Sequence, residues 1–108
     1  MKKGEIWTVN IPYLGGHEQS GTRPAIIMAN AGSSVVLVIP CTSNFRALRF
    51  PYTIRLEPTS VNGLDIMSIA LVGQLRAIDK KRLNKQIGII EESILEEINQ
   101  MLKDLLLL

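Results

Sequence analysis

The fold is decided by residues 25–39, AIIMANAGSSVVLVI, in which two uninterrupted apolar runs flank a polar connector. Each run has the length of a strand, and residues 30–34 are rich in types that favour turns. Runs that are apolar at nearly every position are typical of central strands. The stretch therefore predicts two paired central strands, joined as a hairpin.

Shorter strands are predicted on both sides of this hairpin. Residues 6–9 and 52–56 alternate between apolar and polar side chains, and residues 68–72 form a further apolar run. Residues 86–90 are a weaker strand candidate, and residues 79–83 look like a single helical turn that Asp79 is placed to cap. Five or six short strands joined by Gly, Pro and Ser turns predict a mainly β fold, a small antiparallel barrel or a strongly coiled sheet.

A helix is predicted at the C-terminal end, where apolar residues recur at helical spacing. They are Ile90, Ile94, Ile98, Met101, Leu102 and Leu105. This stripe is expected to cover an open face of the barrel. The helix starts either at a capping box formed by Ser93 and Glu96 or at Glu91 and Glu92. The leucines at 105–108 exceed one face, so they either fray or are buried by a second subunit.

Size and composition indicate one globular domain, residues 1–108. Hydrophobic residues make up 46% and charged residues 20% of the chain, which excludes the composition of a disordered protein. The net charge of +2 is too small to argue for nucleic acid by itself. A single cysteine and a single histidine predict no disulfide and no zinc site. With no signal-like segment and no run long enough to cross a membrane, a cytoplasmic protein is expected.

Arg23 is the first candidate for chemistry, because it stands between a glycine-bracketed loop, residues 15–22, and Pro24. Proline restricts the residue before it to extended conformations, so the arginine is held at the start of a strand. A guanidinium there is either an anion clamp or a structural, solvated group. In the same loop, His17 is a candidate for proton transfer, and Glu18 either accepts a proton or pairs with Arg23.

Hydroxyl groups follow the second central strand, in the segment Pro40-Cys41-Thr42-Ser43-Asn44. If the two strands form a hairpin, Arg23 and Thr42 come within reach of one phosphate. The alternative is a turn in which Thr42 and Ser43 bond to the backbone. Cys41 is more typical of a core residue than of a nucleophile.

Four ordered motifs resemble the MazF/PemK family of toxin endoribonucleases. They are residues 4–7 (GEIW), 16–24 (GHEQSGTRP), 40–43 (PCTS) and 74–83 (QLRAIDKKRL). The resemblance implies a small SH3-like barrel, a homodimer and metal-independent cleavage of single-stranded RNA. It also implies inhibition by a cognate antitoxin protein, and it implies no cofactor.

The resemblance implies catalytic roles for Arg23 and Thr42, with attack by the ribose 2′-hydroxyl on the adjacent phosphate. The residues that it assigns to substrate binding are His17, Glu18, Gln19, Ser43 and Gln74. On spacing alone, the alternative is that Gln74 and Arg76 are structural residues, with Arg76 forming a salt bridge at the rim of the fold.

One departure from the family pattern concerns the residues before Gln74. Many members have an acid directly before this glutamine, and some have an arginine two residues before the acid. Here those positions hold Gly73 and Leu71, so the general base is left open. Two alternatives remain: a non-enzymatic protein-binding toxin of the same fold, like the gyrase inhibitors, or an inactive relative that binds RNA or antitoxin. The presence of both Arg23 and Thr42 favours the enzyme.

Overall fold

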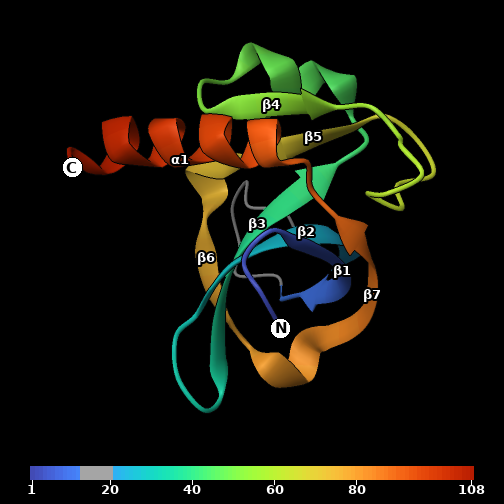
Figure 1. Cartoon of the computed structure of the whole chain (residues 1–108), viewed down its shortest axis with the longest axis vertical. Helices are drawn as coiled ribbons and strands as arrows, with labels where there is room; N and C mark the ends of the chain where they lie inside the picture. The colour runs from blue at the N-terminus through green and yellow to red at the C-terminus, as the bar shows by residue number, and fades with distance from the viewer. Residues whose placement is uncertain (13–20) are drawn as a thin grey trace.

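The computed structural model describes residues 1–12 and 21–108, which form an antiparallel sheet with a helix packed against it (Figure 1). The strands are, in chain order, β1 (Glu5–Ile11), β2 (Gly21–Asn30), β3 (Val35–Thr42), β4 (Thr53–Leu56), β5 (Ser68–Leu71), β6 (Arg76–Asp79) and β7 (Leu83–Ile89). The helix α1 (Glu92–Leu106) follows β7, and short 3-10 turns occupy residues 45–49, 72–74 and 80–82. The predicted class, mainly β with a C-terminal helix, is confirmed.

The hairpin of β2 and β3 is the centre of the sheet, as predicted. The two strands are antiparallel, with Ala25 opposite Pro40 and Ile26 opposite Ile39. Successive side chains enter different cores, because they point to opposite faces of a strand. Ile26 and Ile39 join the core under α1, whereas Ala25 and Val38 join a second core. Burial on both faces explains why the two sequence runs are apolar throughout.

The outer edge of β3 is divided between two partners. Its first half, Val35–Val38, pairs with β6, and its last two residues, Cys41 and Thr42, pair with β5. The strand order is β4-β5-β3-β2-β1-β7, with β6 beside β3. No pairing in the described chain joins β4 to β7, so the sheet is coiled but open, and a closed barrel is not formed.

Strand β6 was not predicted from the sequence. Its four residues, Arg76–Asp79, include one buried side chain, Ile78, and two charged ends. This pattern is too short to show alternation. The strand exists because β3 offers it a free edge, on which Ile78 lies opposite Val36.

Helix α1 covers one face of the sheet next to β4 and β5 (Figure 1). Ile98 is fully buried, and its partly buried neighbours on the helix pack against the same core, as the apolar stripe predicted. The helix begins after Glu91, which makes no capping bond with its side chain, so the capping box at Ser93 is wrong. Within the described residues, no helix is long and apolar enough to cross a membrane.

Of the four C-terminal leucines, Leu105 and Leu106 are helical, and Leu107 follows the helix in a left-handed conformation with a φ of 59°. Leu106, Leu107 and Leu108 are nevertheless 52%, 91% and 87% exposed. The helix therefore ends in an apolar tip that the described residues leave uncovered.

The basic segment after β6 forms the capped turn that the sequence predicted. The Oδ1 atom of Asp79 accepts a hydrogen bond from the Lys81 amide at 2.8 Å. The Nζ atom of Lys80 donates to the Gly32 carbonyl at 2.8 Å, which ties this turn to the β2–β3 connector.

We expect Ile98→Ala to lower the free energy of unfolding by about 2–5 kcal/mol, because it leaves a cavity between α1 and the sheet. Denaturant unfolding followed by circular dichroism measures the change. Glu97→Ala is the control on the same helix, and we expect it to change stability by less than about 0.5 kcal/mol because Glu97 is exposed. Equal effects of the two substitutions would contradict the assigned packing.

Candidate active site

Arg23 and Thr42 lie at the open end of the β2–β3 hairpin. The last pair of the two strands is Ala25 opposite Pro40, and Arg23 and Thr42 each lie two positions beyond it, on the same face as their neighbour in that pair. Directly opposed residues of an antiparallel pair have their side chains on the same face of the sheet. On its other side, Arg23 lies opposite Val9 of β1. The hairpin thus brings together the two residues that the sequence proposed for one phosphate.

Thr42 takes part in a turn between its hydroxyl and the backbone, which was the structural alternative considered for it. Its residue is 7% exposed, and its Oγ1 accepts a hydrogen bond from the Asn44 amide at 3.2 Å. The Oδ1 of Asn44 accepts in turn from the Arg46 amide at 3.1 Å and caps the 3-10 turn that follows. Because a hydroxyl both accepts and donates, this turn fixes Thr42 Oγ1 without using its proton.

A cavity of about 620 Å³ lies beside this end of the hairpin. Strands β1, β2, β3, β5 and β7 reach its wall, and residues 63–66 complete it. The hydroxyl-bearing residues in the lining are Thr8, Thr22, Ser43 and Ser68. Among the described lining residues, Arg23 is the one cation and Asp65 the one carboxylate.

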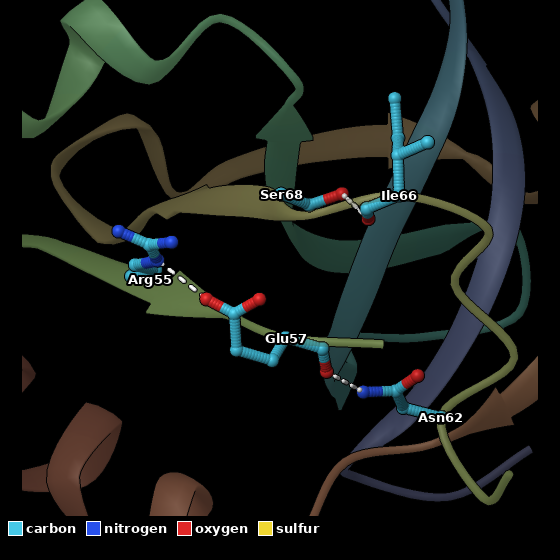
Figure 2. Close-up of polar contacts among 5 residues, drawn as sticks. All are labelled: Arg55, Glu57, Asn62, Ile66 and Ser68. Carbon is cyan, nitrogen blue, oxygen red and sulfur yellow. Dashed lines mark hydrogen bonds and ion pairs between the residues drawn. The ribbon is translucent and has the colours of Figure 1, made fainter. Parts of the chain in front are cut away.

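Asn62 holds the loop that forms this wall. It is 1% exposed, and its Oδ1 accepts from the amides of Thr59 and Leu64, each at 3.0 Å. Its Nδ2 donates to the Glu57 carbonyl at 2.9 Å (Figure 2). A buried amide with its partners satisfied is stable, whereas one unpaired polar atom costs about 1–3 kcal/mol. Asn62 therefore fixes residues 57–64 as a unit.

Two glycines allow this loop to lie directly on β7. A Cβ atom on Gly63 would stand 1.9 Å from the Ile87 carbonyl oxygen, and Gly63 has a φ of +70°. A Cβ atom on Gly88 would stand 2.3 Å from the carbonyl carbon of Asn62. The Ile89 amide donates to the Val61 carbonyl at 3.0 Å and closes the contact. The loop and β7 touch through their backbones, at a distance that no side chain permits.

Cys41 is a core residue, as predicted, although one edge of it reaches the cavity. It is 0% exposed. Burial raises the pKa of its thiol to about 12, and the positive charge of Arg23 opposes this shift only in part. The thiol is therefore protonated at neutral pH, which makes it a poor nucleophile.

The other predicted site residues do not all line the cavity beside Arg23. Ser43 lines the cavity with Arg23, but Gln74 lies at the opposite end of β5, in a second cavity of about 280 Å³. Gly73 and Leu71, the two departures from the family pattern, also line this second cavity. His17, Glu18 and Gln19 lie outside the described residues.

Sequence reasoning missed the loop that carries Asn62 and Asp65. The Asn62-Gly63 pair is a turn signal that could have marked it. Nothing in the sequence indicates that Asp65 meets Arg23, 42 positions earlier, in one cavity. Within residues 1–12 and 21–108, no group of three or more His, Cys, Asp or Glu residues could hold a metal ion.

The fold and site define a small coiled-sheet protein with an arginine and a threonine at the end of its central hairpin. A family model described as "PemK-like, MazF-like toxin of type II toxin-antitoxin system" matches residues 2–106. The chain belongs to this family.

Named relatives agree with this membership. "Endoribonuclease MazF9" of Mycobacterium tuberculosis is 31% identical over 112 residues, which cover 95% of this chain and 93% of the relative. "Endoribonuclease MazF" of Staphylococcus epidermidis is 28% identical over 106 residues, which cover 94% of this chain and 88% of the relative.

Solved structures share the fold along the whole chain. MazF (Form-I) from Deinococcus radiodurans superposes with a TM-score of 0.81 at 24% identity, covering 100% of this chain and 97% of that one. The MazE-MazF structure (Form-II) from Deinococcus radiodurans gives a TM-score of 0.74 at 25% identity, covering 98% of this chain and 95% of the matched chain.

We expect Gly63→Ala to lower the free energy of unfolding by about 2–4 kcal/mol, since the new Cβ meets the β7 backbone at a left-handed φ. Gly73→Ala is the matched control: its Cβ would lie 3.6 Å from the Tyr52 Cβ, an ordinary contact. We expect this control to stay within about 0.5 kcal/mol of the parent. Thermal and denaturant unfolding compare the two, and a neutral Gly63→Ala would contradict the close contact of loop and strand.

Proposed function

We propose that this chain cleaves single-stranded RNA at the end of the β2–β3 hairpin, with Arg23 and Thr42 as its catalytic residues. As a PemK-like, MazF-like protein it is an RNA-cleaving toxin of a toxin-antitoxin system. What the proposal adds is the place and the chemistry. The observation that supports it is the hairpin register: Arg23 and Thr42 each lie two positions beyond the last pair, Ala25 and Pro40, at the same end of the hairpin.

The reaction we propose is attack of a ribose 2′-hydroxyl on the adjacent phosphorus. Negative charge grows on the phosphoryl oxygens as the new P–O bond forms. Arg23 stays protonated at cellular pH and presents several N–H donors to those oxygens. Thr42 Oγ1 donates a hydrogen bond to one of them, since this oxygen already accepts a hydrogen bond from the Asn44 amide. As the P–O2′ bond forms, the P–O5′ bond breaks; the 2′-hydroxyl loses its proton to solvent and O5′ takes a proton from solvent. The products are a 2′,3′-cyclic phosphate, or its hydrolysis product, and a 5′-hydroxyl.

Attack by the 2′-hydroxyl needs a backbone that can bring this oxygen in line with the leaving O5′. A paired A-form strand resists that rotation, so unpaired RNA is the proposed substrate. The substrate contacts proposed for His17, Glu18, Gln19, Ser43 and Gln74 would extend along the strand. Because Ser43 and Gln74 line different cavities, they would contact different nucleotides.

Two protein partners belong to the proposal. A cognate antitoxin is proposed because a related structure contains MazE with MazF, and another contains an endoribonuclease with its cognate antitoxin. A second copy of this chain is proposed because the apolar tip of α1 is left uncovered, with Leu107 91% exposed. The cytoplasm is the proposed location, since RNA and the antitoxin are available there.

We expect Arg23→Ala to slow RNA cleavage by about 10²- to 10³-fold or more, because a donor to the developing charge is lost. Thr42→Val should slow it by a smaller factor. The substrate is a long single-stranded RNA in EDTA, beside its duplex, with the fragment ends mapped for a 5′-hydroxyl.

Arg46→Ala is the matched control for this test, because Arg46 is an exposed arginine on the 3-10 turn after Ser43. Its rate should equal that of the parent. Parent-like cleavage by a folded Arg23→Ala variant would falsify the assignment of Arg23. A parent protein that cuts no RNA would favour the non-enzymatic alternatives.

We expect the protein to sediment as a homodimer at micromolar concentration, with the α1 tip in the interface. Replacing Leu107 and Leu108 together by Glu should give a monomer, because charged groups cannot be buried there unpaired. Analytical ultracentrifugation measures the mass, and Ser93→Glu at the other end of α1 is the control. A monomeric parent would refute the dimer. A double variant that stays dimeric would show that the α1 tip is not in the interface.

A further inference from the structure

Asp65 gives the cavity beside Arg23 a carboxylate that no other described lining residue provides. Asp65 is exposed, as are Thr22, Ser43 and Ile66 around it, so the cavity is open to solvent. Its volume of about 620 Å³ lies within the range of ~300–1,000 Å³ in which small molecules bind. A ligand that enters there meets this carboxylate.

The backbone on both sides of Asp65 is held in place. The Leu64 amide donates to Asn62 Oδ1 at 3.0 Å, and the Leu64 side chain is buried in the core under α1. The carbonyl of Ile66 accepts from Ser68 Oγ at 3.2 Å (Figure 2). Asp65 is thus held between two anchored neighbours, which reduces the cost of fixing its carboxylate on a ligand.

Arg23 and Asp65 lie on the wall of one cavity. Arg23 lines it between Thr22 and Pro24 of β2, and Asp65 lines it from the loop that Asn62 holds. A phosphate bound by Arg23 therefore lies at this cavity, where the base of a neighbouring nucleotide can contact Asp65.

The chemistry of the lining selects among the four RNA bases. An ionised carboxylate only accepts hydrogen bonds. The Watson–Crick edge of guanine carries two adjacent donors, N1–H and N2–H. Adenine and cytosine set one amino donor beside an acceptor nitrogen, and uracil sets its single N3–H between two carbonyls, so each places an acceptor against the carboxylate. Pro24, Leu64 and Ile87 supply apolar contacts for the face of a base.

We propose that this cavity is a base-recognition pocket, in which Asp65 accepts hydrogen bonds from N1–H and N2–H of a guanine next to the phosphate held by Arg23. The proposal rests on the proposed function, because the phosphate belongs to the RNA being cut. It assigns Asp65 to specificity and not to proton transfer.

The test compares RNA oligonucleotides that are identical except for guanine, inosine or adenine at the nucleotides on either side of the cleaved bond. Inosine lacks the N2 amino group and keeps N1–H. The parent should prefer guanine over inosine by about 10-fold or more in kcat/KM at one position, and over adenine by up to about 100-fold. Asp65→Asn should reduce both ratios close to one.

Glu57→Gln is the control, since Glu57 is an exposed carboxylate at the start of the same loop and does not line the cavity. It should keep the parent's preference. A parent that cuts guanine and inosine substrates equally overturns the proposal. So does an Asp65→Asn variant that is slower on every sequence with an unchanged preference, because that result assigns Asp65 to proton transfer.

Binding of 2′-O-methyl oligonucleotides of the same sequences separates this proposal from the proposed function. These ligands cannot be cleaved, so their dissociation constants report recognition alone. Guanine preference that depends on Asp65 supports the pocket even for a protein that cuts nothing. Cleavage by the parent without any base preference in binding or rate overturns the pocket and leaves the proposed function intact.

Discussion

Burial of the β2–β3 hairpin on both of its faces is the constraint on which the rest of the structure depends. Ile26 and Ile39 fill the core under α1, while Ala25 and Val38 fill the second core. A register slip by one residue would exchange the two sets, so the pairing is strongly specified. The same register brings Arg23 and Thr42 to one end of the hairpin, two positions beyond Ala25 and Pro40, so packing in two cores fixes where the proposed catalytic residues lie.

The second constraint is the backbone contact between the Asn62 loop and β7. Because Gly63 and Gly88 have no side chains, the two backbones can touch. The side-chain amide of Asn62 bonds to the Thr59 amide and the Glu57 carbonyl inside the loop. These contacts together restrict the conformation of the loop. The loop wall of the cavity is therefore anchored on both sides of Asp65, by the bonds of Leu64 and Ile66.

The site combines apolar surroundings with a few polar groups placed at strand ends. Cys41 shows the effect of burial, which raises the pKa of its thiol to about 12 in spite of the nearby arginine. Thr42 is nearly buried, and its hydroxyl is oriented by the Asn44 amide. An arginine beside a fixed hydroxyl at the edge of a core needs little rearrangement to bind a phosphate, which is the basis of electrostatic preorganisation.

The central hairpin, the other strands except β6, the Asp79 turn and the C-terminal helix could all be predicted from the sequence. Each has a local signal: an apolar run, an alternation, a capping residue or a helical period. The placement of Arg23 and Thr42 at one end of the hairpin could also be predicted, because a hairpin joins its own two ends. Only the tertiary structure decided that β6 pairs with β3, that the sheet stays open, and that Gln74 lies at a second cavity. The same holds for Asp65 and Arg23, which line one cavity because the Asn62 loop lies on β7, a contact between segments far apart in the chain that no local pattern records.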